Sequence, residues 1–368
     1  MSLRDYQQEA VDWLSETRRG IVKCPAGGGK TRIAATAIDW VARSVQRDRQ
    51  ANVTWLANTN EQVDQAKEAL AMFPAISNLC RLRVACWQSG IDCSEEDLVV
   101  VDECHHAGAP TLAAMVSTAP NARWGLSATP LGMDPEKNLV MLALFDFKQF
   151  EVKRERIVDG GHLTKAKVFL HSDTDAGISD IINEEVPKLL SEQMKKQPWL
   201  DEAEQRKRIT WQLCQTLGIV QNSLRNKRIT SICGGCTTDA ILTLVGTVEH
   251  GQTLAREIPE SVVCHSGMGA KKRRAAIAGF RDGSLRVMIA TSMCDEGFDA
   301  PRASVLILAR AGRSPGLVEQ RTGRVLRLFE GKTHGIIHDF TDLQHPMLKA
   351  QSKSRQRTYR KLGYEIAS

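Results

Sequence analysis

Short apolar runs rich in β-branched residues recur along the chain, and they alternate with longer stretches in which apolar residues have helical spacing. Strands that are buried on both faces of a parallel sheet have such continuous apolar runs. The pattern therefore predicts an α/β fold in which helices flank largely parallel sheets. We expect strands at 20–24, 53–57, 98–101 and 124–128, and then at 241–245, 261–265, 287–290, 305–309 and 335–340.

The expected strands fall into two sets, separated by a more charged stretch that is rich in helix-forming residues. The chain has 368 residues, and typical domains have roughly 150, so two domains are expected. We expect a first domain at 1–150, a connecting and partly helical region at 151–228, a second domain at 229–345 and a basic C-terminal tail at 346–368.

The composition is that of a globular protein, with 42% hydrophobic and 25% charged residues, and it argues against a disordered chain. No apolar run is long enough to span a bilayer, and the first residues lack the apolar segment of a signal peptide. We therefore expect no membrane association. The expected location is the cytoplasm, including the cytoplasm of a host cell or an association with the nucleoid.

The excess of basic residues is concentrated at the C-terminus. The whole chain has 49 basic and 43 acidic residues, a net charge of +6. From residue 346 onward, six basic residues stand against one acidic residue, Glu365, which gives +5. The six are Lys349, Lys353, Arg355, Arg357, Arg360 and Lys361. Such a segment suits a polyanion such as nucleic acid, and a solvated helix is the alternative.

The ten cysteines are irregularly spaced and do not form a disulfide framework. Cys233 and Cys236 are the only close pair with the spacing of metal ligands, and no second pair or regularly spaced histidine accompanies them. We predict reduced thiols and no metal ion held by cysteine.

A glycine-rich loop follows the first expected strand. It reads Pro25-Ala26-Gly27-Gly28-Gly29-Lys30-Thr31 and leads into a helix-like stretch. Glycines let backbone amides converge on phosphate oxygens, and the helix N-terminus adds partial positive charge. Lys30 can reach the β- and γ-phosphates, and the Thr31 hydroxyl can bind Mg²⁺. The usual pattern has glycine where Cys24 stands.

Two adjacent carboxylates, Asp102 and Glu103, follow the apolar strand at 98–101. Ligand sites of α/β proteins lie at the carboxyl ends of parallel strands. Asp102 is therefore a candidate for the Mg²⁺ shell, and Glu103 for the base that orients and deprotonates an attacking water. The loop and the carboxylates together predict a site for ATP and Mg²⁺.

The motifs resemble those of a superfamily 2 helicase with an Asp-Glu-x-His box. Leu3-Arg4-Asp5-Tyr6-Gln7 is similar to the family's adenine-recognising motif, and Trp55-Leu56-Ala57-Asn58-Thr59 resembles its first strand-binding motif. Ser127-Ala128-Thr129-Pro130 matches the coupling motif. In the second half, the similar segments are Thr247-Val248-Glu249-His250-Gly251, residues 290–299, and Gln320-Arg321-Thr322-Gly323-Arg324-Val325-Leu326-Arg327.

The resemblance implies two tandem RecA-like domains, and it assigns roles to single residues. Catalysis is expected of Lys30, Glu103, Gln320, Arg324 and Arg327, with the arginines acting on the γ-phosphate when the two domains close over ATP. Nucleotide contacts are expected of Arg4, Gln7, Gly27, Gly28, Gly29, Lys30, Thr31, Gly297 and Asp299. Ser127 and Thr129 are expected to couple hydrolysis to strand binding. Asn58, Thr59, Thr291 and Ser292 are candidate nucleic-acid contacts, and Gln88 and Ser89 are weaker ones.

The expected function is that of a nucleic-acid-stimulated ATPase that moves on DNA and unwinds or remodels it. DNA is favoured over RNA because the motif set resembles DNA-repair, recombination and phage-type members. Two alternatives stay open. One is an RNA helicase, and the other is a helicase-like ATP switch subunit that controls a nuclease or another protein partner.

Overall fold

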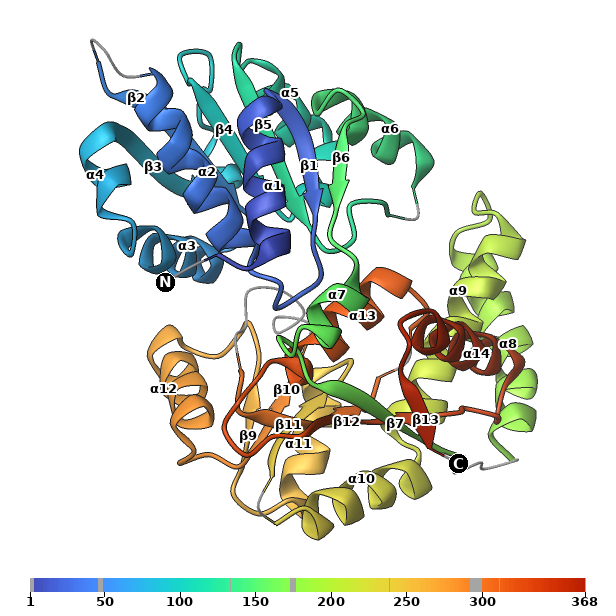
Figure 1. Ribbon diagram of the computed structural model, residues 1–368. Coiled ribbons are helices and arrows are strands. Elements are labelled where there is room, and N and C mark those ends of the chain that lie inside the picture. The colour runs from blue at the N-terminus through green and yellow to red at the C-terminus, as the bar shows by residue number, and fades with distance from the viewer. Residues whose placement is uncertain are drawn as a thin grey trace. The chain divides into compact units, whose positions relative to one another are not determined.

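The computed structural model describes residues 3–45, 49–132, 134–172, 177–237, 239–291, 300–310 and 312–367. The chain divides into two compact units, Met1–Leu163 and Thr164–Ser368. Each unit contains a parallel sheet flanked by helices, as Figure 1 shows. The predicted α/β class is therefore confirmed. Across the described ranges no helix is long and apolar enough to cross a membrane.

The sheet of unit 1 has the strand order β3-β2-β4-β5-β1-β6, and each neighbouring pair is parallel. Its strands are β1 (Arg19–Lys23), β2 (Ala51–Ala57), β3 (Cys80–Cys86), β4 (Leu98–Asp102), β5 (Ala122–Ser127) and β6 (Gln149–Glu151). Its helices are α1 (Asp5–Glu16), α2 (Lys30–Val45), α3 (Asn60–Ala71), α4 (Pro74–Leu79), α5 (Pro110–Ser117), α6 (Pro135–Leu144) and α7 (Arg154–Asp159), with short turns at Trp87–Ser89 and Cys104–Gly108.

The sheet of unit 2 has the order β13-β7-β12-β11-β8-β10-β9, again with parallel neighbours. Its strands are β7 (Lys165–His171), β8 (Ala240–Leu244), β9 (Ser261–Cys264), β10 (Val287–Ala290), β11 (Ala303–Leu308), β12 (His334–Phe340) and β13 (Glu365–Ala367). Its helices are α8 (Gly177–Lys196), α9 (Glu202–Gln215), α10 (Ser223–Gly235), α11 (Val248–Glu257), α12 (Ala270–Asp282), α13 (Pro315–Gly323) and α14 (Pro346–Lys361), with a π-helical turn at Thr216–Val220 and a 3-10 turn at Arg324–Leu326.

Apolar side chains cover the faces of both sheets. In unit 1, Ile21, Leu56 and Val99 pack with residues of α5 and α6. In unit 2, Ile241 and Ile289 pack with Leu254 of α11. A separate cluster joins α8 and α9 to α14 through Leu348. Burial of such side chains is the main favourable contribution to folding.

The expected connecting region at 151–228 does not exist as a separate part. Residues up to 163 belong to unit 1, and β7 pairs with both β12 and β13 inside the second sheet. The expected boundaries at 150 and 228 therefore move to a single one at 163/164. β7 has no continuous apolar run, because its buried residues alternate with polar and half-exposed ones. The apolar pattern of the sequence therefore does not predict this strand.

The expected basic tail at 346–368 is also part of unit 2. Residues 346–361 form α14, and β13 adds a strand to the sheet. Arg355, counted among the tail's free charges, is buried in ion pairs with Asp339 and Asp342. The segment is therefore an integral helix and strand of unit 2.

Candidate active site

The glycine-rich loop joins β1 to the start of α2 at Lys30. Gly27 and Gly29 have φ values of 84° and 88°, which favour glycine over residues with a side chain. A Cβ atom on Gly28 would lie 2.4 Å from Cys24 Sγ. Cys24 N donates to Ser127 O at 3.0 Å and ties the loop to β5. The loop therefore has the tight backbone that a phosphate site needs.

Cys24 stands where the usual pattern has glycine, and its position explains why it is tolerated. The side chain is fully buried and lies beneath Gly28. Burial raises the pKa of the Cys24 thiol to about 11, so the thiol stays neutral at ordinary pH. The sulfur supports the loop from below without adding a charge.

Residues at the start of α1 hold the loop from the other side. Tyr6 Oη and Gln7 Nε2 each donate to Gly28 O at 3.1 Å. Gln7 Oε1 accepts from Arg4 N at 3.1 Å, and Arg4 Nη1 donates to Tyr6 Oη at 2.7 Å. The predicted nucleotide residues Arg4 and Gln7 are thus brought to the loop. Sequence analysis gave no role to Tyr6, although it stands inside the same motif.

The two predicted carboxylates lie at the carboxyl end of β4. Glu103 Oε1 is 3.2 Å from Lys30 Nζ, and each of these side chains is 14% exposed. Glu103 has a φ of 48°, a left-handed conformation that is uncommon for this residue type. Asp102 Oδ1 accepts from Glu103 N at 3.0 Å. The site therefore brings together the loop lysine and both carboxylates.

Partial burial and opposite charge compete at this ion pair. Burial alone would raise the pKa of Glu103, but Lys30 and then His105 hold it well below its ordinary value. Burial alone would lower the pKa of Lys30, but Glu103, Asp102 and Cys24 raise it. Both groups are therefore charged at neutral pH.

One predicted coupling residue touches the same carboxylate, and the other holds the first in place. Ser127 Oγ donates to Glu103 Oε2 at 3.2 Å, and Thr129 N donates to Ser127 Oγ at 3.1 Å. His105 Nδ1 lies 3.5 Å from Glu103 Oε2 and 3.3 Å from Ser127 Oγ. A movement of the segment after β5 would therefore act directly on the Glu103 carboxylate.

A second polar chain leads from the histidines to Asn58. The rings of His105 and His106 lie 4.1 Å apart, and Asn58 Nδ2 is 3.4 Å from His106 Nε2. Asn58 Oδ1 accepts from Trp87 Nε1 at 3.2 Å and from Gln88 Nε2 at 3.1 Å. Asn58 and Gln88, two candidate nucleic-acid contacts, are thus side by side. No role was predicted for His106 or Trp87. The adjacent histidines His105 and His106 were the one local pattern that could have indicated His106.

Thr59, another candidate contact, has a structural use for its hydroxyl. Thr59 Oγ1 accepts from Gln62 N at 3.2 Å and caps the N-terminus of α3. Ser, Thr, Asp and Asn are preferred at this position because they satisfy a helix amide. A nucleic-acid contact by Thr59 stays a prediction.

Thr31 and Asp102 carry the kind of oxygen donor that Mg²⁺ prefers, and their role as its ligands stays a prediction. Thr31 is in the first turn of α2, Asp102 ends β4, and both are partly exposed. Within the described ranges no group of three or more His, Cys, Asp or Glu residues could hold a metal ion. Mg²⁺ commonly takes one or two protein oxygens and fills its shell with water and substrate phosphates. Thr31 and Asp102 match that requirement.

In unit 2 the motif residues lie at the carboxyl ends of strands and on α13. Thr247 Oγ1 caps α11 by accepting from His250 N at 3.2 Å. His250 is fully buried, and its Nε2 is 2.9 Å from Asn226 Oδ1. Thr291 follows β10 and is 9% exposed. Ser292, Gly297 and Asp299 lie outside the described residues.

The last motif spans α13 and the 3-10 turn after it. Gln320 and Arg324 are 8% and 7% exposed, so both are largely buried. Arg327 directly follows the turn, and burial lowers the pKa of its guanidinium, with a further contribution from Arg281. Catalytic roles for Gln320, Arg324 and Arg327 stay predictions.

Two family models match the chain. The family described as "Type III restriction enzyme, res subunit" matches residues 1–80, and "Helicase conserved C-terminal domain" matches residues 219–329. The first match contains the phosphate loop, and the second contains the whole of the last motif. The two matches follow the order of the two units.

Individual relatives are helicases and translocases. A candidate helicase of Sulfolobus islandicus filamentous virus is 24% identical over 92% of this chain and 64% of its own length. "DNA 3'-5' translocase XPB2" of Sulfurisphaera tokodaii is 25% identical over 89% of this chain and 79% of its own length. The chain thus spans just under two thirds of the viral relative.

The fold is shared with solved helicase structures. The helicase domain of Pyrococcus furiosus Hef superposes with a TM-score of 0.55 at 15% identity, covering 92% of this chain and 95% of that domain. Phosphate loop, acidic box, coupling motif and final arginine motif occur in the family's order on two RecA-like units. The chain belongs to the superfamily 2 helicases.

Proposed function

We propose that the chain is an ATP-dependent motor that translocates on DNA and separates or remodels its strands. The observation that carries this proposal is the Glu103 carboxylate. One of its oxygens pairs with Lys30 of the phosphate loop, and the other accepts from Ser127 of the coupling motif. A single group therefore touches both the phosphate-binding element and the element expected to respond to nucleic acid.

ATP can replace Glu103 as the partner of Lys30. The triphosphate is a stronger anion than one carboxylate, so Lys30 turns to the β- and γ-phosphates when ATP binds. Glu103 then loses its cation and is available to accept a proton from water. While the pair lasts, Lys30 and His105 hold the pKa of Glu103 low, so the carboxylate is ionised when ATP arrives. Departure of Lys30 removes part of that effect and makes Glu103 a stronger base. Mg²⁺ held by Thr31 and Asp102 would neutralise charge on the phosphates.

Contact with Ser127 offers a route for coupling. Ser127 and His105 hold the second oxygen of Glu103 while Lys30 holds the first. Strand binding near Asn58 can reach His105 through the adjacent ring of His106. We therefore propose that DNA binding changes the orientation of Glu103 and so the rate of ATP hydrolysis.

DNA is preferred as the track because relatives are named as DNA translocases or DNA helicases. An RNA track is the nearest alternative, since two shorter matches are to RNA helicases. The test is ATP hydrolysis by the purified chain with single-stranded DNA, duplex DNA, forked DNA and matched RNA. We expect at least one DNA form to stimulate more than RNA does. Stronger stimulation by RNA would assign the chain to RNA.

A switch role in a larger complex is a second candidate, and the match to a restriction-enzyme subunit favours it. In that role ATP turnover would control a nuclease or another partner without strand separation. A strand-displacement assay on a forked duplex separates the two functions. DNA-stimulated hydrolysis with displaced strand supports the helicase, whereas stimulated hydrolysis without displacement supports the switch.

A further inference from the structure

The outer face of α14 has a row of exposed basic side chains. Four of them follow one another at intervals of four residues, and a fifth stands beside the last. We call them the α14 basic row: Lys349, Lys353, Arg357, Arg360 and Lys361. With about 100° of rotation per residue, all five fall within a sector of roughly 120°. The helix therefore concentrates its charge on one face.

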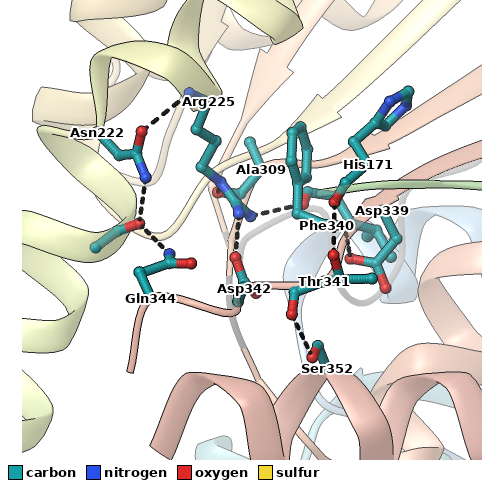
Figure 2. A network of polar contacts seen from close by, with 12 residues as sticks. His171, Asn222, Arg225, Ala309, Asp339, Phe340, Thr341, Asp342, Gln344 and Ser352 are labelled. Atoms are coloured by element: carbon teal, nitrogen blue, oxygen red, sulfur yellow. Dashed lines mark hydrogen bonds and ion pairs between the residues drawn. The ribbon is translucent and has the colours of Figure 1, made fainter. Parts of the chain in front are cut away.

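The opposite face of α14 is buried and fixes the helix. Leu348 enters the cluster formed by α8 and α9, and Ser352 Oγ donates to Thr341 O at 2.9 Å, a contact drawn in Figure 2. Arg355 pairs with Asp339 at 2.8 Å and with Asp342 at 3.0 Å. Tyr359 Oη donates to Asp339 Oδ2 at 2.7 Å. The basic row therefore stands on a rigid helix.

The strand end under α14 is itself held from a second helix. Arg225 of α10 pairs with Asp342 and donates to Ala309 O at 3.3 Å, as Figure 2 shows. Two arginines and two aspartates thus neutralise each other inside unit 2, with every side chain at most 2% exposed. This internal cluster leaves the net charge of the basic row uncompensated.

None of the five basic residues forms an ion pair with any residue in the described parts of the chain. α14 contains no acidic residue, and the nearby Glu365 is paired with Lys167 at 3.4 Å. Lys188 of α8, by contrast, pairs with Glu185 at 2.8 Å. Like charges four residues apart destabilise a helix slightly, so the row adds a cost that folding itself does not require.

The helix dipole explains only part of the row. Arg360 and Lys361 lie in the last turn, where positive charge is favourable. Lys349 is near the N-terminus of α14, where positive charge opposes the dipole. An outside anion that follows the whole helix would compensate all five charges.

We infer that the α14 basic row is a docking surface for the sugar-phosphate backbone of DNA. The row is about 18 Å long at 1.5 Å per residue, a length over which one strand of B-form DNA presents about five phosphates. Lysine and arginine bind phosphates through charge and hydrogen bonds without reading the bases. The inference rests on the proposed function and gives the motor a DNA contact outside its motifs.

The experiment compares DNA binding by two matched variants of the full chain. The first carries Lys349→Gln, Lys353→Gln, Arg357→Gln and Lys361→Gln. The second removes the same number of lysines and arginines from α8 and α9, where Lys195, Lys196, Lys207 and Arg208 are exposed. Affinity for a fluorescent duplex and for its single strand is measured without nucleotide, between about 50 and 200 mM salt. Thermal unfolding checks that both variants fold.

The α14 variant is expected to bind DNA on the order of 10²-fold more weakly, with the slope of log affinity against log salt reduced by about 3 to 4. The α8–α9 variant is expected to keep most of the wild-type affinity and slope. Equal losses in both variants would reduce the effect to net charge and overturn the inference. Wild-type binding in the α14 variant, or no DNA binding by the wild type, would also overturn it.

A polyglutamate chain of matched charge distinguishes DNA from an acidic protein surface. Tighter α14-dependent binding of polyglutamate than of DNA would assign the row to a protein partner and contradict the inference. ATP hydrolysis is measured separately. DNA-stimulated hydrolysis with unchanged binding by the α14 variant rejects the docking surface and keeps the motor. Row-dependent binding without stimulated hydrolysis keeps the docking surface and rejects the motor.

Discussion

Both units have a pair of acidic residues at the carboxyl end of a central parallel strand, but the pairs are used differently. In unit 1, Glu103 after β4 meets Lys30 with both side chains 14% exposed. In unit 2, Asp339 of β12 meets Arg355 with exposures of 1% and 2%. The Lys30–Glu103 ion pair is therefore accessible to a ligand, whereas the Arg355–Asp339 ion pair is buried and inaccessible.

The basic partners explain the difference. Lys30 begins a helix directly after a glycine loop, and its side chain stays partly exposed. Arg355 comes from α14, which packs over the strand end and brings Tyr359 with it. Removing one partner from a buried pair leaves an uncompensated charge, whereas a partly exposed pair can change partners. In this chain, the acidic strand end whose cation is partly exposed is the candidate site, and the one whose cation is buried is structural.

The largest expected effect concerns Arg324, which is almost as buried as Arg355 but belongs to the last helicase motif. Arg324→Ala is expected to lower ATP turnover by about 10³ to 10⁵, because arginines of this kind stabilise the charge of the transferring phosphoryl group. ATP affinity should stay near normal. The exposed Arg313, just before α13, provides the control Arg313→Ala. Retained turnover in Arg324→Ala would place Arg324 with Arg355 as a structural residue.

Arg355→Met tests the structural side of the comparison. The free energy of unfolding of unit 2 is expected to fall by about 3 to 5 kcal/mol, because Asp339 and Asp342 lose a buried partner. Arg357→Met, two residues along the same helix but exposed, should change it by less than about 0.5 kcal/mol. Urea unfolding measures both. Equal stability of the two variants would show that the buried cluster does not hold α14.

Acid should weaken unit 2 through His250. Burial, with a further contribution from Arg225, lowers its pKa from 6.5 to about 4. Between these values the unfolded chain binds more protons than the folded chain, so stability falls as the pH drops from 6.5 to 4, by on the order of 3 kcal/mol. His250→Asn should lose this part of the pH dependence, whereas the exposed His334→Asn should keep it. Parallel unfolding curves for all three proteins would contradict the assignment.

The smallest effect is expected at His106, which links Asn58 to the ring of His105. His106→Phe keeps an aromatic ring but cannot accept from Asn58. The ratio of DNA-stimulated to unstimulated ATP turnover should fall on the order of fivefold, a typical coupling free energy between sites of about 1 kcal/mol. Combining it with Asn58→Ala should add little, because both changes break the same contact. Fully additive losses would argue against this route.

All nine strands expected from the sequence are present, with ends shifted by at most two residues. They were predictable because buried parallel strands have continuous apolar runs. The edge strand β3 and the more exposed β7 were missed, since their burial is interrupted by exposed residues. The edge strands β6 and β13 were also missed, since each has only three residues. α14 was misread as a tail because Arg355 finds its partners only in the folded chain.

Local motifs located the phosphate loop and Glu103 because the residues that make this part of the site are neighbours in sequence. The residues that hold this part of the site in place were harder to predict from the sequence. Tyr6 reaches Gly28 across 22 residues, and Trp87 reaches Asn58 across 29. These contacts depend on how α1 and the segment after β3 pack, and no spacing rule within the chain encodes that packing.

The central claim is that Glu103 is the base of an ATP-hydrolysing site while the acidic pair of unit 2 is structural. The most direct test is ATP turnover and ATP binding in Glu103→Gln, measured with a stimulating DNA beside the wild type. We expect ATP to bind while turnover falls by about 10² to 10⁴, the usual contribution of a general base. Unchanged turnover in Glu103→Gln would contradict the account.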